Sequence, residues 1–189
     1  MERRIFLLLS LLFLTMGIYA QEADEIHLKE GCLSFFQQEA LAFVQVDLSG
    51  TEYGKENLYE EYRQTDVEEL SKKLLDRSLS DFCVQFNFQN KGHLQVSSKK
   101  TDADLRLEIH LRQLNTGSAG GVLNIDDKTA CGAKISGFVN LIEVSTSKPL
   151  CVIEFRDVTS ESRLSKKARI AGAFEELGFL LSYLSVYWS

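Results

Sequence analysis

Residues 104–113 read DLRLEIHLRQ, and polar and apolar side chains alternate along the whole stretch. Leucine or isoleucine occupies every second position, and Arg106, Glu108, His110 and Arg112 stand between them. This period of two places all the apolar side chains on one face of a strand and leaves the other face wet. The stretch therefore favours an antiparallel sheet covered on a single side over a doubly wound parallel sheet.

Four further segments have the composition of strands. They are residues 43–48, 94–97, 135–145 and 150–158. The last two are joined by Thr146-Ser147-Lys148-Pro149, whose turn-forming residues predict a hairpin. Within 135–145 the apolar positions change face, so we expect a bulge or two-sided burial near Leu141.

Two amphipathic helices complete the predicted fold, because their apolar residues recur three and four positions apart. The expected N-caps and last residues are Thr65 or Asp66 with Phe86, and Ser160 or Ser162 with Leu184. Such helices pack their apolar faces on the buried side of a sheet. The sequence therefore predicts an α+β two-layer sandwich: a mainly antiparallel sheet of four to six strands with two helices on one face.

The N-terminus has the order of a secretory signal peptide. Glu2-Arg3-Arg4 is followed by an uncharged run over 5–18 and by Tyr19-Ala20-Gln21. This run of 14 residues is shorter than the roughly 20 that a membrane-spanning helix needs, so a cleaved signal is favoured over an anchor. We expect cleavage after Ala20 and a single domain over 21–189, exported to the periplasm or secreted, soluble and without a membrane span.

The mature chain is expected to be acidic. The full chain has 21 Lys and Arg against 27 Asp and Glu, and removal of residues 1–20 would change its net charge from −6 to −7. Nucleic acid is therefore not an expected partner, because binding a polyanion requires clustered Lys and Arg. The densest basic group, Arg163, Lys166, Lys167 and Arg169, is expected on the solvated face of the last helix.

Four cysteines, Cys32, Cys83, Cys131 and Cys151, remain after cleavage. Disulfides and buried free thiols are both compatible with an exported chain. Zinc is disfavoured, because no two cysteines are close in sequence and the histidines lack ligand spacing. If the hairpin places Cys151 opposite Val144, Cys131 lies about 43 Å away along a continuous strand. We therefore predict that Cys131 and Cys151 are not bonded to each other.

No motif for catalysis, metal or cofactor is complete. Residues 117–120 lack the residue count of the Gly-x-Ser-x-Gly nucleophile turn. Residues 102–104 and 124–127 hold paired carboxylates but lack the glycine and glutamate of a calcium loop. His110 is compatible with a proton shuttle or with an ordinary solvated strand face. The sequence therefore predicts no catalytic residue, no metal site and no cofactor.

The stretch 115–132 is the longest predicted loop. It contains an apolar tip, Val122, Leu123 and Ile125, followed by the carboxylates Asp126 and Asp127. Loops on a rigid scaffold often carry binding groups, so we predict that these five residues bind a partner. The alternative is that the three apolar residues form one more buried strand.

Several segments resemble a family of small exported proteins of Gram-negative bacteria whose function is uncharacterised. They are residues 27–31, 102–107, 140–150 and 171–174. The resemblance covers most of residues 25–180 and implies no catalytic or metal-binding residue, and the four cysteines depart from the family's pattern. More distantly, the element order is similar to sheet-and-helix domains of envelope lipoproteins that help to assemble outer-membrane machinery. That likeness is one of fold and implies no activity.

These observations favour an exported, non-enzymatic envelope protein that binds or scaffolds a partner, either another envelope protein or a small ligand. The alternative is a hydrolase or carbohydrate-active domain with a shallow site in the 114–132 loop. Carboxylates paired across a cleft would indicate the enzyme, and a large exposed apolar edge or groove would indicate the binding protein.

Overall fold

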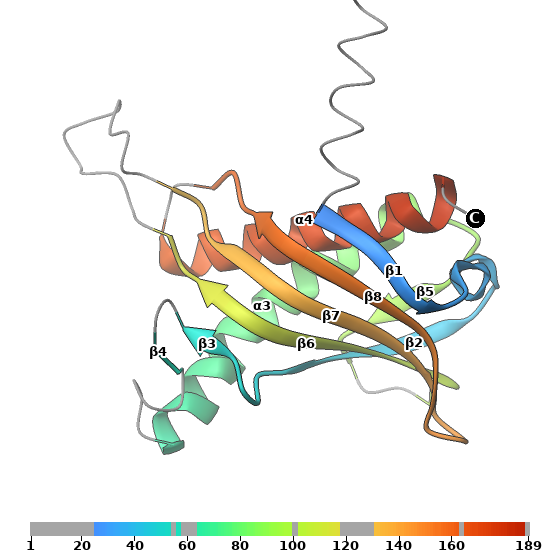
Figure 1. The fold of residues 1–189 in the computed structure, drawn as a ribbon, viewed down its shortest axis with the longest axis horizontal. Coiled ribbons are helices and arrows are strands. Elements are labelled where there is room, and N and C mark those ends of the chain that lie inside the picture. The colour runs from blue at the N-terminus through green and yellow to red at the C-terminus, as the bar shows by residue number, and fades with distance from the viewer. Residues whose placement is uncertain are drawn as a thin grey trace, which may run out of the picture.

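The computed structural model describes residues 25–53, 56–57, 64–99, 102–117, 131–162 and 165–187. Within them, one sheet packs against two long helices (Figure 1). The strands are β1 (Ile26–Gly31), β2 (Leu41–Asp47), β3 (Glu52–Tyr53), β4 (Glu56–Asn57), β5 (Gln95–Ser97), β6 (Leu105–Asn115), β7 (Lys134–Glu143) and β8 (Lys148–Thr159). The helices are α3 (Gln64–Gln89), α4 (Lys166–Tyr187) and the short 3-10 helix η1 (Leu33–Gln37).

The sheet is mixed, and its main path runs in the order β1-β8-β7-β6-β2-β5. Neighbours from β1 to β6 are antiparallel, whereas β2 is parallel to both β6 and β5. The parallel joints have a topological cause, because the chain crosses over through α3 between β2 and the two later strands. The α+β fold with a mainly antiparallel sheet is confirmed.

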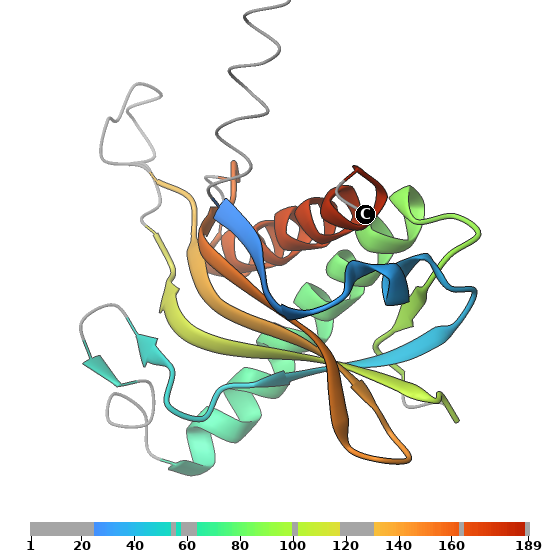
Figure 2. The same ribbon diagram turned by 45° about the vertical axis from the view of Figure 1, so that its right-hand side comes forward.

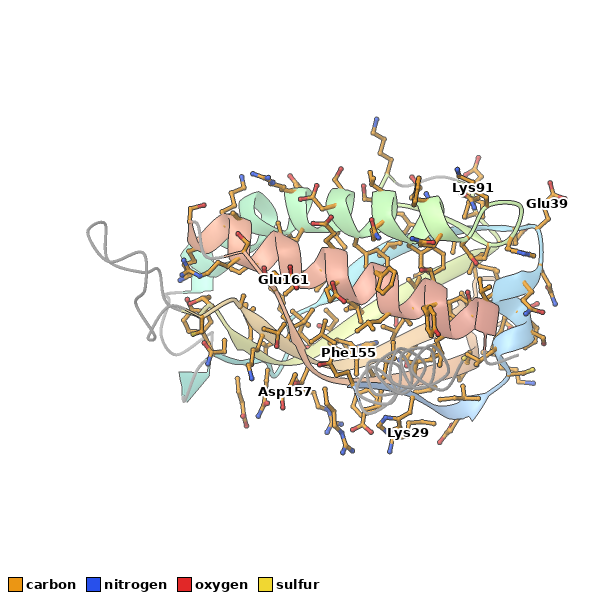
Figure 3. The ribbon with its side chains drawn as sticks, turned by 90° about the horizontal axis from the view of Figure 1, so that it is seen from above. Lys29, Glu39, Lys91, Phe155, Asp157 and Glu161 are labelled. Atoms are coloured by element: carbon orange, nitrogen blue, oxygen red, sulfur yellow. The ribbon has the colours of Figure 1, made fainter. Side chains whose placement is uncertain are left out.

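Both long helices lie on the same face of the sheet (Figure 2), and Figure 3 shows the two layers from above. The second helix begins at Lys166, so the predicted cap at Ser160 or Ser162 is wrong. Ser160 is buried, and its Oγ accepts a hydrogen bond from the backbone N–H of Ser162 (3.0 Å), which forms a turn instead. The cap is Ser165, whose Oγ accepts the backbone N–H of Ala168 at 3.3 Å.

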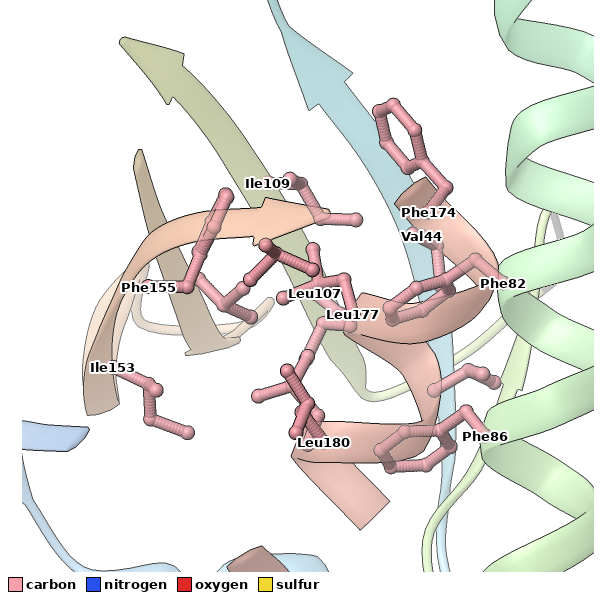
Figure 4. Close-up of a cluster of buried hydrophobic side chains, with 14 of the residues drawn as sticks. Val44, Phe82, Phe86, Leu107, Ile109, Ile153, Phe155, Phe174, Leu177 and Leu180 are labelled. Atoms are coloured by element: carbon pink, nitrogen blue, oxygen red, sulfur yellow. The ribbon is translucent and has the colours of Figure 1, made fainter. Parts of the chain in front are cut away.

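The core lies between the sheet and the helices. Figure 4 shows its central side chains, which are Val44, Leu107, Ile109, Ile153 and Phe155 from the sheet and Phe82, Phe86, Phe174, Leu177 and Leu180 from the helices. None of them is more than 2% exposed. Leu105, Leu107, Ile109 and Leu111 are all buried, so the predicted apolar face of the 104–113 strand is confirmed.

The predicted hairpin is formed by β7 and β8, and the predicted irregularity near Leu141 is confirmed by a shift of register between Leu141 and Ile142. The expected partner of Cys151 is wrong, because Cys151 pairs with Leu141 rather than Val144. The partner differs because the turn occupies residues 144–147, earlier in the chain than predicted, so β8 already begins at Lys148. The start of β7 lies opposite Thr159, which is about 26 Å from Cys151 along β8.

The edge strand β1 is not among the strands that the sequence predicts. β1 pairs with β8 along one side, and only Ile26 among its residues is buried. Its apolar alternation is limited to Ile26 and Leu28, of which Leu28 is exposed, and this is too short a pattern to identify a strand from the sequence.

Candidate functional site

The face of the sheet opposite the helices carries a groove of about 940 Å³. Its lining comes from β1, β2, β3, β6, β7 and β8 and includes Glu30, Asp47, His110, Phe138 and Glu154. Figure 1 looks onto this face, with the helices behind the sheet. The groove therefore lies on the wet face of the 104–113 alternation, whereas the sequence predicts the binding site in the 115–132 loop.

One row of side chains crosses five neighbouring strands of the groove. In order, they are His27, Glu154, Phe138, His110 and Asp47, each opposite the next in the strand register. Strands lie about 4.8 Å apart, so the row is roughly 19 Å long. Phe138 is half-buried and stands at its centre. The row thus places one carboxylate–imidazole pair on each side of an aromatic ring.

His110 lies between two carboxylates. Its Nδ1 is 3.0 Å from Asp47 Oδ2, and its Nε2 is 3.1 Å from Glu108 Oε2. A neutral imidazole has one N–H and can donate to one of them, whereas the imidazolium can donate to both. The backbone N–H of Ser49 donates to Asp47 Oδ1 (2.8 Å), and hydrogen bonds from Ser49, aided by His110, lower the pKa of Asp47.

Glu108 is the enclosed member of this cluster, with a side chain 14% exposed. Its Oε1 accepts a hydrogen bond from Gln45 Nε2 (2.6 Å) and lies 2.7 Å from Arg106 Nε. Together with His110, these neighbours hold the carboxylate in one orientation. Glu108 is therefore a fixed acceptor on the groove's side of the sheet.

Glu154 gathers two cationic side chains and one imidazole. Its Oε2 lies 2.8 Å from Lys29 Nζ and 2.9 Å from His27 Nε2, while Arg156 Nη2 donates to both carboxylate oxygens at 3.0 and 2.9 Å. The hydrogen bond from Lys29 is the largest cause that lowers the pKa of Glu154 to about 2, and Arg156 adds to it. Figure 3 places Lys29 on the side of the sheet away from the helices. Glu154 is therefore ionised and already compensated.

The guanidinium of Arg112 stacks on the Phe138 ring. Arg112 lies over it with 4.6 Å between the guanidinium carbon and the ring centroid. Within the described residues no hydrogen bond or ion pair of Arg112 is present, so its N–H groups face solvent. The ring is therefore a surface on which a cation can stack.

Negative charge is in excess around the groove. The carboxylates in its lining are Glu30, Asp47, Glu52, Glu154 and Asp157, and the guanidiniums are Arg112 and Arg156. Glu30 and Asp157 have no cationic side chain within 4.0 Å among the described residues, and Glu52 accepts a hydrogen bond from the Gln113 amide at 3.4 Å. The centre of the groove is thus balanced and its rim is acidic.

The described residues contain neither a metal-binding cluster nor a membrane-spanning helix. No three His, Cys, Asp or Glu side chains among them are grouped so that they could hold a metal ion. None of their helices combines the length and the apolar character needed to cross a membrane.

The predicted partner-binding residues, Val122, Leu123, Ile125, Asp126 and Asp127, lie outside the described residues. The base of their loop is described. Gly117 has φ +63°, and a Cβ there would lie 2.6 Å from the carbonyl carbon of Gly132, so the two ends of the stretch are in close contact.

Arg169 binds the backbone at the base of the 115–132 loop. This corrects the expectation that the whole basic cluster is solvated. Its side chain is buried and donates to the carbonyl oxygens of Thr116 and Gly117. A buried guanidinium requires such acceptors, because it has given up its hydration.

Phe138, Glu154 and His27 are not among the site residues that the sequence predicts. Glu154 and Arg156 stand at the polar positions of an apolar alternation in β8, which is a signal that the sequence contains. The row across five strands contains no such signal, because it depends on the register between strands far apart in sequence.

Comparison with known proteins gives a likeness of fold. No protein-family model matches the chain, and no curated protein matches it. Among solved structures, a PelC dodecamer from Paraburkholderia phytofirmans is similar, with 10% identity, a TM-score of 0.40 and coverage of 83% of this chain and 96% of that one. A single-substitution variant of the same PelC gives 8% identity, a TM-score of 0.37 and coverage of 83% and 95%. The likeness concerns the arrangement of helices and strands alone.

Proposed function

We propose that this chain is an exported, non-enzymatic binding protein whose groove docks a positively charged segment of a partner in the cell envelope. The observation that carries the proposal is the groove itself, where five carboxylates face two guanidiniums on the uncovered side of the sheet. The signal-like order of residues 2–21 supports the export.

The distribution of charge favours a basic partner over a neutral one. The central carboxylates Asp47, Glu108 and Glu154 are held by their own neighbours, while Glu30 and Asp157 at the rim remain available. Complementary charge at an interface speeds association and selects the partner. Phe138 adds a half-buried ring that accepts a stacked cation, as Arg112 does here.

The alternative, a hydrolase, is less well supported by the chemistry of this face. Carboxylates do stand on both sides of Phe138, which is the arrangement that would indicate such an enzyme. A general acid needs a carboxyl whose pKa is raised towards neutrality. In the groove the pKa values of Asp47 and Glu154 are lowered instead, by Ser49 and by Lys29 respectively. Both groups are therefore suited to binding cations and not to donating protons.

A titration with defined peptides tests the proposal. Calorimetry would compare a lysine-rich peptide with a glutamate-rich peptide of equal length at low and at high salt. We expect measurable binding of the lysine-rich peptide only, weakened by salt because screening reduces the attraction between charges. Equal binding of both peptides, or binding of neither, would contradict the proposal.

Matched variants separate the groove from the overall negative charge. The groove variant carries Glu30→Gln, Glu52→Gln and Asp157→Asn, and the control carries Glu39→Gln, Glu161→Gln and Glu175→Gln, all outside the groove. Each variant loses three negative charges, so the two variants have the same net charge. The groove variant is expected to lose peptide binding, and the control to keep it. If the two variants weaken binding equally, net charge rather than the groove is responsible.

Export is tested on its own. Intact mass of the protein isolated from its native cells is expected to correspond to a chain that begins at Gln21. A chain that retains Met1 to Ala20 in a membrane pellet would contradict export with cleavage.

A further inference from the structure

Two cysteines meet where the edge strand β1 leaves the sheet. Gly31, the last residue of β1, is opposite Cys151 in β8, and Cys32 follows it directly. The backbone N–H of Cys32 donates to the carbonyl oxygen of Leu150 at 3.4 Å. In an antiparallel pair of strands, the residues next to a hydrogen-bonded pair face each other without hydrogen bonds, and their Cα atoms are about 4.5 Å apart. Gly31 and Cys151 occupy such a position. Cys32 is therefore one residue from a close approach to Cys151.

Gly31 makes this approach possible. Its φ is +85°, a conformation that L residues rarely adopt, and it interrupts the alternation of side chains at this point. A Cβ on Gly31 would lie 2.8 Å from the Cα of Cys151, so only glycine permits the chain to pass so near β8. After Gly31 the chain turns into η1, and Cys32 is its N-cap residue with extended dihedral angles.

The two thiols have opposite environments. Cys32 is exposed, its Sγ is 2.9 Å from Ser34 Oγ, and hydrogen bonds from Ser34 lower the pKa of its thiol. Cys151 is 1% exposed, and burial raises the pKa of its thiol to about 12, with a further contribution from the charge of Cys32. Cys32 is thus the accessible nucleophile, and Cys151 is the protected thiol within reach of its charge.

We propose that Cys32 and Cys151 are a site of disulfide formation that ties the edge strand β1 to the body of the sheet. The oxidant is a small or protein disulfide. The Cys32 thiolate attacks one of its sulfurs and releases the other as a thiolate, which leaves a mixed disulfide on Cys32. Cys151 then gives up its proton, attacks the Cys32 sulfur and releases the second thiolate of the oxidant. The oxidant is reduced to two thiols, and the two protein thiols become one disulfide.

The structure also indicates how the reaction is limited. The second step requires Cys151 to leave its buried position briefly, so the mixed disulfide at Cys32 is expected to form first and to be consumed more slowly. The finished bond encloses the chain from Cys32 to Cys151, a long loop whose closure restricts the unfolded state. It holds β1, which has six residues and is the longer of the two edge strands of the main sheet path, since β5 at the other edge has three residues. This inference does not depend on the proposed function of the groove.

Mass mapping of the mature chain after exposure to oxidised glutathione tests the site. Peptides prepared without reductant are expected to contain a Cys32–Cys151 bridge in the wild type and in a Cys83→Ser control. The bridge is expected to be absent in Cys32→Ser, and glutathione is expected to remain on Cys32 in Cys151→Ala. A different pairing, or a wild-type Cys32 that keeps glutathione at the end of the reaction, would overturn the proposal.

Thermal unfolding gives a second readout that does not depend on mapping. Oxidation is expected to raise the Tm of the wild type and of Cys83→Ser by several degrees and to leave the Tm of Cys32→Ser unchanged. Cys32 is exposed, so its substitution leaves the core intact and the variant remains a folded reference. An equal rise in Tm for Cys32→Ser would also overturn the proposal.

Discussion

The side chain of Arg169 joins helix α4 to the end of β6, because its Nε donates to the carbonyl oxygen of Thr116 at 2.7 Å. Its Nη2 donates to the carbonyl oxygen of Gly117 at 3.3 Å, and the residue is 5% exposed. The guanidinium thus satisfies backbone groups at the point where the chain leaves the sheet towards residue 118. The first prediction concerns this link.

Replacement of Arg169 by leucine is expected to lower the free energy of unfolding by about 2 kcal/mol, as is typical for hydrogen bonds that involve a charged group. Urea denaturation would measure the loss. Lys167→Leu is the matched control, because Lys167 precedes it on the same helix and is exposed. Equal effects of the two substitutions would show that Arg169 contributes no more than a surface charge.

The second prediction concerns the pH dependence of the stability that Glu154 contributes. The pKa of Glu154 is lowered to about 2, chiefly by Lys29, from an ordinary value of about 4.3. A carboxyl with a lowered pKa in the folded state contributes stability above its unfolded pKa, and this contribution is lost as the pH falls through the folded value. The stability difference between the wild type and Glu154→Gln is therefore expected to shrink below about pH 4.3. Urea denaturation at several pH values checks this, with Glu39→Gln as the exposed control. A difference that stays constant down to the lowest pH would contradict it.

The third prediction concerns the contact between the two helices. Gly178 of α4 lies against α3, and a Cβ at this position would be 2.7 Å from the carbonyl oxygen of Phe82. Gly178→Ala is expected to destabilise the protein by about 1–3 kcal/mol, because the helices must separate. This loss exceeds the gain in helix propensity, which is about 1 kcal/mol.

Gly172→Ala in the same helix is the control for this prediction. Its Cβ would meet the Oγ of Ser160, a side-chain atom and not a backbone atom, so the contact is relieved by rotation of one side chain at the loss of its hydrogen bond from Ser162. Thermal unfolding is expected to show a Tm several degrees lower for Gly178→Ala than for Gly172→Ala. If both substitutions change the Tm alike, the helix contact at Gly178 has no special role.

The fourth prediction tests the 115–132 loop, whose tip lies outside the described residues. The double substitution Leu123→Ser and Ile125→Ser is expected to reduce the capture of envelope partners while the Tm stays unchanged. Val84→Ser provides a control, because Val84 is an apolar side chain 67% exposed on α3. A Tm lowered by several degrees in the double variant alone would show that Leu123 and Ile125 belong to the core.

Much of the fold follows from patterns that are local in sequence. The alternation around Leu107 and Ile109 identifies the buried face of β6, and the spacing of Phe82 and Phe86 identifies α3, because each pattern reports a period of one element. The parallel pairing of β2 with β6 and the edge strand β1 are not local. They depend on which strands lie side by side, and β1 has only one buried side chain to reveal it.

The groove could not be predicted from the sequence for the same physical reason, because it depends on which strands lie side by side. The residues Glu108 and His110 are readable as a polar face, and their neighbourhood in β6 is apparent. Their other partners come from elsewhere: Asp47 from β2, and Phe138 from β7. A polar face alone does not distinguish separate hydrated charges from a cluster in which Glu108 is 14% exposed.

Helix α4 fills the middle of the core, and this position constrains the order of folding. Phe174, Leu177 and Leu180 cover apolar side chains of strands that are synthesised much earlier, and β1 at the start of the described chain pairs with β8 near its end. Contacts between such distant segments make folding slow, because long loops must close before the contacts form. Until α4 has been made, the apolar face of the sheet has no complete cover, so the growing chain depends on protection from aggregation until this helix is available.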